Sequence, residues 1–399
     1  MNHGNSKLVN IAGLSITLML LSLLVSCGNP DTATITEQPL TPLTPTTVPT
    51  TALPAGTHTV AIDGHSLTLP NGFTISRLAS GRDGLRMMAL TDDGLLLVTE
   101  MGRGDVLGYR LADANPQPVT VLKGLSSTSG IALHDQYLFI AETTRVTRYE
   151  YQGNGAVGPG QVIIPNLPAG GHDTRTIGFG PGNRLYLTVG SSCNVCEETD
   201  PRRAAMSRYN SDGSDGQVIA SGLRNAVGFT WHPVTGEIWA TDNGRDNIGD
   251  DIPPDEVDII KEGKNYGWPY CYGDRAVNPE FQDDNARAAY CAGTEPPAVA
   301  LQAHSAALGL RFLSDPSWPV SYQNDLFIAF HGSWNRTVPT GYKVVRVDAN
   351  GKVSDFITGW LDEKTGEVWG RRVDILFANN RMYITDDSSG SIYEVCYEG

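Results

Sequence analysis

Basic residues are scarce in this chain. Its 399 residues include 29 Lys and Arg against 44 Asp and Glu, so the net charge is 29 − 44 = −15. Proteins that bind nucleic acid present a basic surface to the phosphate backbone. The composition therefore excludes nucleic acid as the expected partner.

Helical periodicity is also missing, because no long stretch after residue 57 repeats its apolar residues with a helical period. Glycine and proline are abundant, with 44 and 24 residues in a chain that is 40% hydrophobic. A disordered chain would be less hydrophobic, so this combination indicates many tight turns around a packed core. We expect an all-β globular domain.

Near the N-terminus, the apolar run from Ile11 to Val25 is too short for a membrane-spanning helix. It follows Lys7 and ends in Leu-Val-Ser-Cys, which is similar to the bacterial lipobox, in which the cysteine (here Cys27) becomes lipid-modified. An ordinary signal peptide that happens to contain a cysteine is the alternative.

The chain is therefore expected to have three parts. Residues 1–26 form a lipoprotein signal peptide, residues 27–56 a Thr- and Pro-rich tether, and residues 57–399 the folded domain. We expect an exported protein that its lipid anchors to the periplasmic or extracellular face of a membrane.

Cysteine is rare, and Cys27 leaves only five of the six cysteines for the folded domain. Export implies an oxidising environment, in which pairing is expected. Cys193 and Cys196 are spaced for a structural disulfide, since no second Cys or His pair offers the spacing of a zinc site. Cys271 and Cys291 flank one loop that a disulfide would close, which leaves Cys396 over.

A degenerate phrase occurs six times: a short apolar strand, a turn, and a second strand that ends in a small or hydroxyl residue. Its second strands begin near Leu95, Tyr137, Leu185, Glu237, Leu326 and Met382. Paired strands repeated at roughly 40 to 50 residues are typical of propeller blades. Six copies predict a six-bladed β-propeller, with a β-sandwich of regular hairpins as the alternative.

The segment 222–273 contains the densest chemistry of the chain. An Arg-Asn pair, Arg224 and Asn225, precedes a loop rich in carboxylates and the rigid turn GKNYGWP. The carboxylates are Asp242, Asp246, Asp250, Asp251, Asp255, Glu256 and Asp258. Oxygen-rich loops suit a hard cation such as calcium, and a nearby arginine suits an anionic or quinone oxygen.

Upstream of this segment, His172 lies in the sequence Gly-His-Asp-Thr-Arg, just before a predicted blade strand. A neutral imidazole in such a loop can take a proton from a sugar hydroxyl. A histidine in a loop is also commonly a solvated surface group, so its place alone does not decide its role.

From about Gly170 to Glu394, the order and spacing of these motifs resemble those of bacterial pyrroloquinoline-quinone (PQQ) sugar dehydrogenases, the soluble glucose and sorbosone dehydrogenase group. The resemblance implies that His172 is the general base and that Arg224 and Asn225 bind the cofactor. It also implies that the carbonyl groups of Gly244 and Arg245 bind calcium.

Because PQQ has three carboxylates, its pocket needs several cations. In the resembling family these follow later blade strands, which points to Arg336, Arg371 and Arg372. The chain departs from glucose dehydrogenases at Val227, where they have Gln, and at Arg245, where they have Pro. Its HGSWNR segment is similar to the sorbosone type.

The resemblance predicts an enzyme that oxidises an aldose or related sugar, of the sorbosone or pyranose type, with PQQ and calcium. Arg224 would polarise the quinone, and electrons would pass to a quinone or small redox carrier. Two alternatives stay open: a calcium-dependent lactonase-like hydrolase, and a non-catalytic binding propeller at the cell envelope.

Overall fold

The computed structural model describes residues 56–281 and 284–398, which lie in the second of the two compact units of the chain, residues 50–399. The predicted signal peptide, nearly all of the tether and Cys27 lie outside the described residues. Among the described helices, none is both long enough and apolar enough to cross a membrane.

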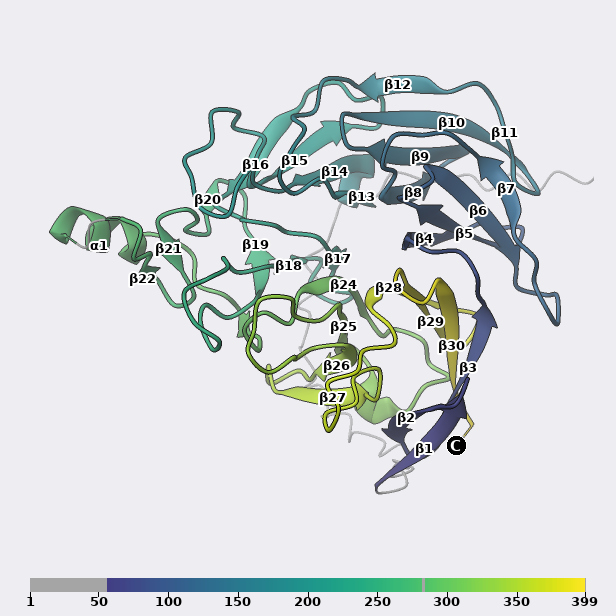
Figure 1. Ribbon diagram of the computed structural model, residues 1–399. Coiled ribbons are helices and arrows are strands. Elements are labelled where there is room, and N and C mark those ends of the chain that lie inside the picture. The colour runs from purple at the N-terminus through teal and green to yellow at the C-terminus, as the bar shows by residue number, and fades with distance from the viewer. Residues whose placement is uncertain (1–55, 282–283, 399) are drawn as a thin grey trace, which may run out of the picture. The chain divides into compact units, whose positions relative to one another are not determined.

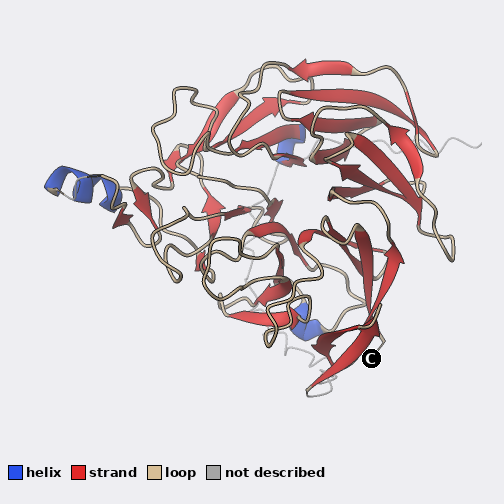
Figure 2. Ribbon diagram, in the orientation of Figure 1, coloured by secondary structure: helices blue, strands red, loops and turns tan. Residues whose placement is uncertain are grey.

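Six antiparallel sheets surround a central channel (Figures 1 and 2). The first sheet consists of β4 (Leu85–Leu90), β5 (Leu95–Glu100), β6 (Asp105–Arg110) and β7 (Val119–Leu122). The second consists of β8 (Gly130–His134), β9 (Tyr137–Glu142), β10 (Arg145–Gly153) and β12 (Gln161–Ile164), with β11 (Ala156–Val157) beside β10. The third consists of β13 (Arg175–Gly180), β14 (Arg184–Val189), β15 (Ala205–Asn210) and β16 (Gln217–Ser221).

The other three sheets continue the ring. The fourth sheet consists of β17 (Phe229–Trp231), β18 (Ile238–Asp242), β19 (Glu256–Ile260) and β23 (Val299–Ala300). The fifth consists of β24 (Ala307–Phe312), β25 (Leu326–Phe330), β26 (Lys343–Val347) and β27 (Val353–Ile357). The sixth consists of β28 (Arg372–Ala378), β29 (Arg381–Asp386) and β30 (Ser391–Tyr397), and β3 (Phe73–Ala79) completes it.

The predicted six-bladed propeller is confirmed, and each predicted second strand begins within one residue of the observed β5, β9, β14, β18, β25 or β29. Tight turns allow the repeated hairpins. Between β4 and β5, for example, Gly94 adopts a φ of 80°, which a residue with a side chain seldom adopts.

The ring is closed by strands from the two ends of the domain, because β3 pairs with β30 in the sixth sheet. Phe73 on β3 is buried among the rings of four other aromatic residues, Trp318, Tyr322, Phe356 and Tyr397. The hairpin of β1 (Thr57–Ile62) and β2 (His65–Pro70) precedes it.

The long fourth repeat contains an insertion between β19 and β23. It holds β20 (Lys264–Asn265), which joins the third sheet, the hairpin of β21 (Cys271–Tyr272) and β22 (Ala276–Val277), and α1 (Asn285–Ala292). The side chain of Asp284 caps α1 by accepting a hydrogen bond from the backbone N–H of Arg287. Two short 3-10 turns, η1 (Pro181–Asn183) and η2 (Val320–Tyr322), lie in other hairpin connections.

The innermost strands of the six sheets, β4, β8, β13, β17, β24 and β28, contact one another around the channel (Figure 1). Near one end, five apolar side chains within two residues of the starts of these strands belong to a single cluster: Met87, Ile131, Val227, Leu308 and Val373. We call these five side chains the apolar ring.

Candidate functional site

A cavity of about 240 Å³ lies at the end of the channel where the innermost strands begin. Four of the predicted site residues line it: His172, Arg224, Asn225 and Gly244. Residues more than 50 positions apart in the chain thus meet at one place, as the propeller architecture predicts.

A larger cavity of about 330 Å³ runs along the channel beyond the apolar ring. It is lined by the innermost strands, and its charged residues are Asp374 and Arg311. None of the predicted site residues lines it, so we take the smaller cavity as the candidate site.

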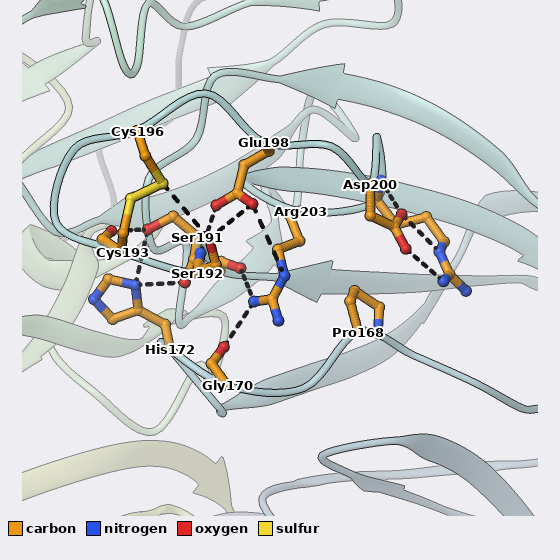
Figure 3. A network of polar contacts seen from close by, with 12 residues as sticks. Pro168, Gly170, His172, Ser191, Ser192, Cys193, Cys196, Glu198, Asp200 and Arg203 are labelled. Atoms are coloured by element: carbon orange, nitrogen blue, oxygen red, sulfur yellow. Dashed lines mark hydrogen bonds and ion pairs between the residues drawn. A yellow bond between two sulfur atoms is a disulfide. The ribbon is translucent and has the colours of Figure 1, made fainter.

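His172 is held by its Nδ1 atom, which lies 3.1 Å from the carbonyl oxygen and 3.0 Å from the Oγ of Ser191 (Figure 3). The Ser191 hydroxyl donates its own hydrogen to the carbonyl of Cys193, at 2.7 Å. Both oxygens near Nδ1 therefore act as acceptors, so we assign the proton to Nδ1. Nε2 is left with a free lone pair and has no hydrogen-bond partner among the described residues.

The imidazole of His172 is held in its neutral form. Burial lowers its pKa to about 4, and the positive charges of Arg224 and Arg203 act in the same direction. The group is thus ready to accept a proton at neutral pH.

The loop before β13 carries His172 and is fixed by two guanidinium groups. Arg175 is fully buried and donates to the carbonyls of Pro168, His172, Thr174 and Thr143, at 2.6 to 3.1 Å. Arg203 donates to the carbonyls of Ala169 and Gly170, the second of these shown in Figure 3. Since both arginines bind backbone oxygens, they fix the loop whatever its side chains are.

Gly190 brings His172 and Asn225 together. A Cβ atom at this position would lie 2.6 Å from the Cβ of His172 and 2.7 Å from the Oδ1 of Asn225, which leaves no room for a side chain. The carboxamide of Asn225 has no hydrogen-bond partner among the described residues, and its backbone N–H is bound by the carboxylate of Asp242. Its side chain is therefore free to bind a ligand in the cavity.

Arg224 is buried, and all five of its N–H groups already have acceptors in the protein. They donate to the carbonyls of Asn194, Asn243 and Gly244, to the Asn194 Oδ1 and to the Asp246 carboxylate, at 2.8 to 3.1 Å. A quinone oxygen would have to replace one of these acceptors. In this structure Arg224 organises the loop 243–246.

The expected calcium-binding carbonyls lie in that loop. Gly244 lines the cavity, its N–H donates to the buried carboxylate of Asp255 at 2.9 Å, and its carbonyl oxygen accepts from Arg224. The side chain of Arg245 turns away from the cavity and binds Asn278 and Glu280. Of the two predicted residues, only Gly244 lines the cavity.

The three arginines expected to bind cofactor carboxylates do not line the cavity. Arg336 binds the carbonyl of Asp250 and the carboxylate of Asp251, and Arg371 donates to His331 Nδ1 at 3.3 Å. The prediction for Arg372 is wrong. Its side chain is fully buried, paired with Asp386 and 3.9 Å from the centre of the Trp360 ring, so no ligand reaches it.

A cationic group that no sequence motif indicated also lines the cavity. Arg86 binds the carboxylate of Asp387 at 2.9 Å, and His331 donates to the same carboxylate from Nε2 at 3.0 Å. Arg86 and His331 both line the cavity. Arg86 lies near the start of the first blade phrase, and Asp387 follows the second strand of the last one. Their positions in the repeated phrase could therefore have predicted that both lie at this end of the propeller.

Trp334 is 72% exposed and lines the cavity, which makes it available to cover a flat or sugar-like ligand. His304 also lines the cavity, and its Nε2 lies 2.7 Å from the carbonyl of Gly249.

The carboxylate-rich loop does not gather into a metal centre of side chains. Among the described residues, the group of potential ligands whose atoms lie within 4.8 Å of one another consists of Cys193, Cys196 and Glu198. Its two cysteines form one of the two predicted disulfides. The other, Cys271–Cys291, is also confirmed, and Cys396 is free.

Known proteins are similar to this chain in sequence. An uncharacterised protein of Borreliella burgdorferi is 31% identical over 84% of this chain and 91% of its own length. A PQQ-dependent pyranose dehydrogenase of Coprinopsis cinerea is 26% identical over 82% of this chain, and the matched part spans 54% of that enzyme.

The structure of the holo form of the PQQ domain of the Coprinopsis cinerea pyranose dehydrogenase superposes with a TM-score of 0.71. It covers 83% of this chain and 97% of that domain at 24% identity, which shows a shared fold. The family model described as TrAA12-like matches residues 67–398. The chain therefore belongs to the TrAA12-like family, a family similar to the PQQ-dependent sugar dehydrogenases.

Proposed function

We propose that this protein oxidises an aldose or related sugar, of the pyranose or sorbosone type, with PQQ and calcium. The observation that carries the proposal is His172: a neutral imidazole whose tautomer is fixed and whose Nε2 has no partner, in a cavity at the channel end. The family relation supports the same chemistry.

The residues present fit the cofactor. The cavity offers a guanidinium at Arg86 and a free carboxamide at Asn225, groups that suit quinone and carboxylate oxygens, and Arg224 would bind such an oxygen in exchange for one of its present acceptors. The oxygen-rich wall at Gly244 and Asp255 suits a hard cation such as calcium. These residues would hold the cofactor and the ion.

When bound, PQQ supplies the acceptor for the hydride that leaves the sugar carbon, and calcium increases its electrophilicity. His172 takes the hydroxyl proton of that carbon on Nε2, while Ser191 keeps the imidazole in the tautomer that permits this. Asn225 and Trp334 orient and cover the ligand, and Arg224 keeps the wall 243–246 in place.

The test is reconstitution. Purified protein is given PQQ and calcium, PQQ binding is followed by absorbance titration, and reduction of a dye is measured with a panel of aldoses. We expect turnover with at least one sugar. We expect His172→Gln to bind PQQ as the parent does but to lose about 100-fold or more in kcat, the usual contribution of a general base.

If the protein neither binds PQQ nor oxidises any of the sugars, the proposal is wrong. Hydrolysis of a lactone without PQQ would instead favour the hydrolase, and sugar binding without any redox activity would favour a binding propeller. Among the described residues, the group of three potential ligand atoms within 4.8 Å of one another is Cys193, Cys196 and Glu198, and its cysteines form a disulfide, which argues against a hydrolytic metal centre of carboxylate side chains.

We also propose that the protein is exported and anchored by a lipid at Cys27. The lipobox-like sequence and the Thr- and Pro-rich segment before the domain support this proposal. The two disulfides of the domain fit an oxidising compartment.

A further inference from the structure

The loop of residues 191–196, between β14 and β15, is closed by the Cys193–Cys196 disulfide and touches His172 (Figure 3). The same loop also contacts Arg224. One end of the loop is Ser191, which fixes the Nδ1 atom of His172. The Ser191 hydroxyl donates to the carbonyl of Cys193, so the disulfide is one hydrogen bond away from the contact with the base.

Asn194 lies inside the disulfide ring and makes five hydrogen bonds. Its carbonyl oxygen accepts from Arg224 Nε and from Trp268 Nε1, both at 3.1 Å. Its Oδ1 accepts from Arg224 Nη2 at 2.9 Å and from the backbone N–H of Asp246 at 2.8 Å, and its Nδ2 donates to the Asp246 carbonyl at 3.1 Å. A single asparagine thus binds a buried guanidinium, the loop 243–246 and the GKNYGWP turn.

We propose that Asn194 is a positioning residue of this site, and that the Cys193–Cys196 disulfide keeps it where it fixes Arg224 beside His172. The inference rests on the proposed function for its activity readout only. The geometry on which it depends is present in the protein without cofactor.

The physical reason is the cost of leaving Arg224 without acceptors. Asn194 accepts two of its five N–H groups, and a buried donor that loses its acceptor costs about 1–3 kcal/mol. Asn194→Ala removes one of these two acceptors, the Oδ1 atom, and an open disulfide also releases the Asn194 carbonyl, so in either case Arg224 shifts toward other acceptors. Its charge then moves away from His172.

This displacement has a readout in the cofactor-free protein, the titration of His172. The charged groups that face this imidazole are Arg224 and Arg203, which lower its pKa, and Asp173, which raises it. Removing the influence of Arg224 therefore raises the pKa of His172 from about 4 toward the ordinary value of about 6.5.

The experiment follows the His172 ring nitrogens by NMR in protein labelled with ¹⁵N-histidine, assigned with His172→Gln. In the parent we expect the proton on Nδ1 and a pKa of about 4. In Asn194→Ala and in Cys193→Ser/Cys196→Ser we expect a higher pKa. The matched control, Cys271→Ser/Cys291→Ser, removes the other disulfide, whose sulfur atoms make no hydrogen bond to His172, Asn194 or Arg224 among the described residues, and should leave the titration unchanged.

Reduction of the parent by a phosphine gives the same test without substitution. The pKa of His172 should rise on reduction in the parent and in Cys271→Ser/Cys291→Ser, but not in Cys193→Ser/Cys196→Ser, which lacks the bond in question. Unchanged titration in the reduced parent and in folded Asn194→Ala overturns the inference, whether or not the protein oxidises sugars.

A second readout uses the enzyme loaded with PQQ and calcium. If the proposed function holds, Asn194→Ala should lower kcat by on the order of tenfold or more, with a smaller effect on KM, because it displaces Arg224 and the loop 243–246 beside the base rather than removing a substrate contact. A change in KM alone would contradict the positioning role. Absence of activity in the parent would count against the proposed function and leave the NMR result to decide the inference.

Discussion

At His172, burial and two guanidinium groups act in the same direction on the imidazole. Arg203 comes from the segment before β15 and Arg224 from the segment before β17, while Ser191 follows β14. The same residue in an open loop would be partly protonated near neutral pH. Its suitability as a base is therefore a property of its neighbours.

This state of His172 predicts the acid limb of the pH profile. A base must be neutral, so kcat/KM should be retained as the pH falls from 7 to 5 and should fall only as it passes through about 4. Rates are measured with the sugar that turns over, at pH values where circular dichroism shows folded protein. An acid limb near 6.5 would contradict the burial and charge argument.

The same group links folding to pH. Because the folded pKa is lowered, the unfolded chain binds a proton to this histidine first. The contribution of His172 to stability is therefore fully present above about pH 6.5 and is lost progressively as the pH falls from 6.5 toward 4.

At the scale of elements, the loops at the starts of the innermost strands carry the site, and buried arginines make these loops rigid. Arg175 at the start of β13 turns its guanidinium back to four carbonyls, three of them in the segment 168–174. A loop that binds its neighbours through backbone oxygens can vary in sequence and keep its shape. Arg175 thus fixes the backbone both before and after His172.

Arg175→Met tests this arrangement. It leaves four carbonyls without their donor, and we expect a loss of unfolding free energy on the order of 3 kcal/mol or more, measured by urea denaturation. The matched control is Arg184→Met on the neighbouring strand β14, where the exposed pair with Asp215 should contribute less than about 1 kcal/mol. Equal losses in the two variants would show that the buried guanidinium has no special role.

At the scale of the whole molecule, β3 closes the ring and the site lies at one end of the channel. Val227 and Leu308 of the apolar ring line this cavity, while Met87 and Ile131 line the larger one. The reacting groups are thus confined to one mouth of the propeller.

The proposed anchor predicts where the protein is found. With Cys27 intact, the protein should fractionate with membranes and incorporate labelled fatty acid, because lipidation transfers it to a membrane surface. Cys27→Ser should lose the label. The control is Cys396→Ser, since Cys396 is also outside the two disulfides, and it should behave as the parent does. Label retained in Cys27→Ser would contradict the anchor.

The sequence by itself determined the propeller, because paired strands and turns are local patterns, and six copies of one phrase can close into a ring. It also identified both disulfides, and four residues of the cavity from the order of their motifs: His172, Arg224, Asn225 and Gly244.

Only the tertiary structure decided which arginines meet the cavity and in which state the base is held. Arg371 and Arg372 are neighbours at the start of β28, and successive side chains of a strand point in opposite directions. One therefore reaches His331, while the other is buried against Trp360. Arg86 reaches the same wall from the first blade, since ring closure brings it to Asp387, 301 residues away. Such meetings depend on packing between blades, which no local pattern in the sequence encodes.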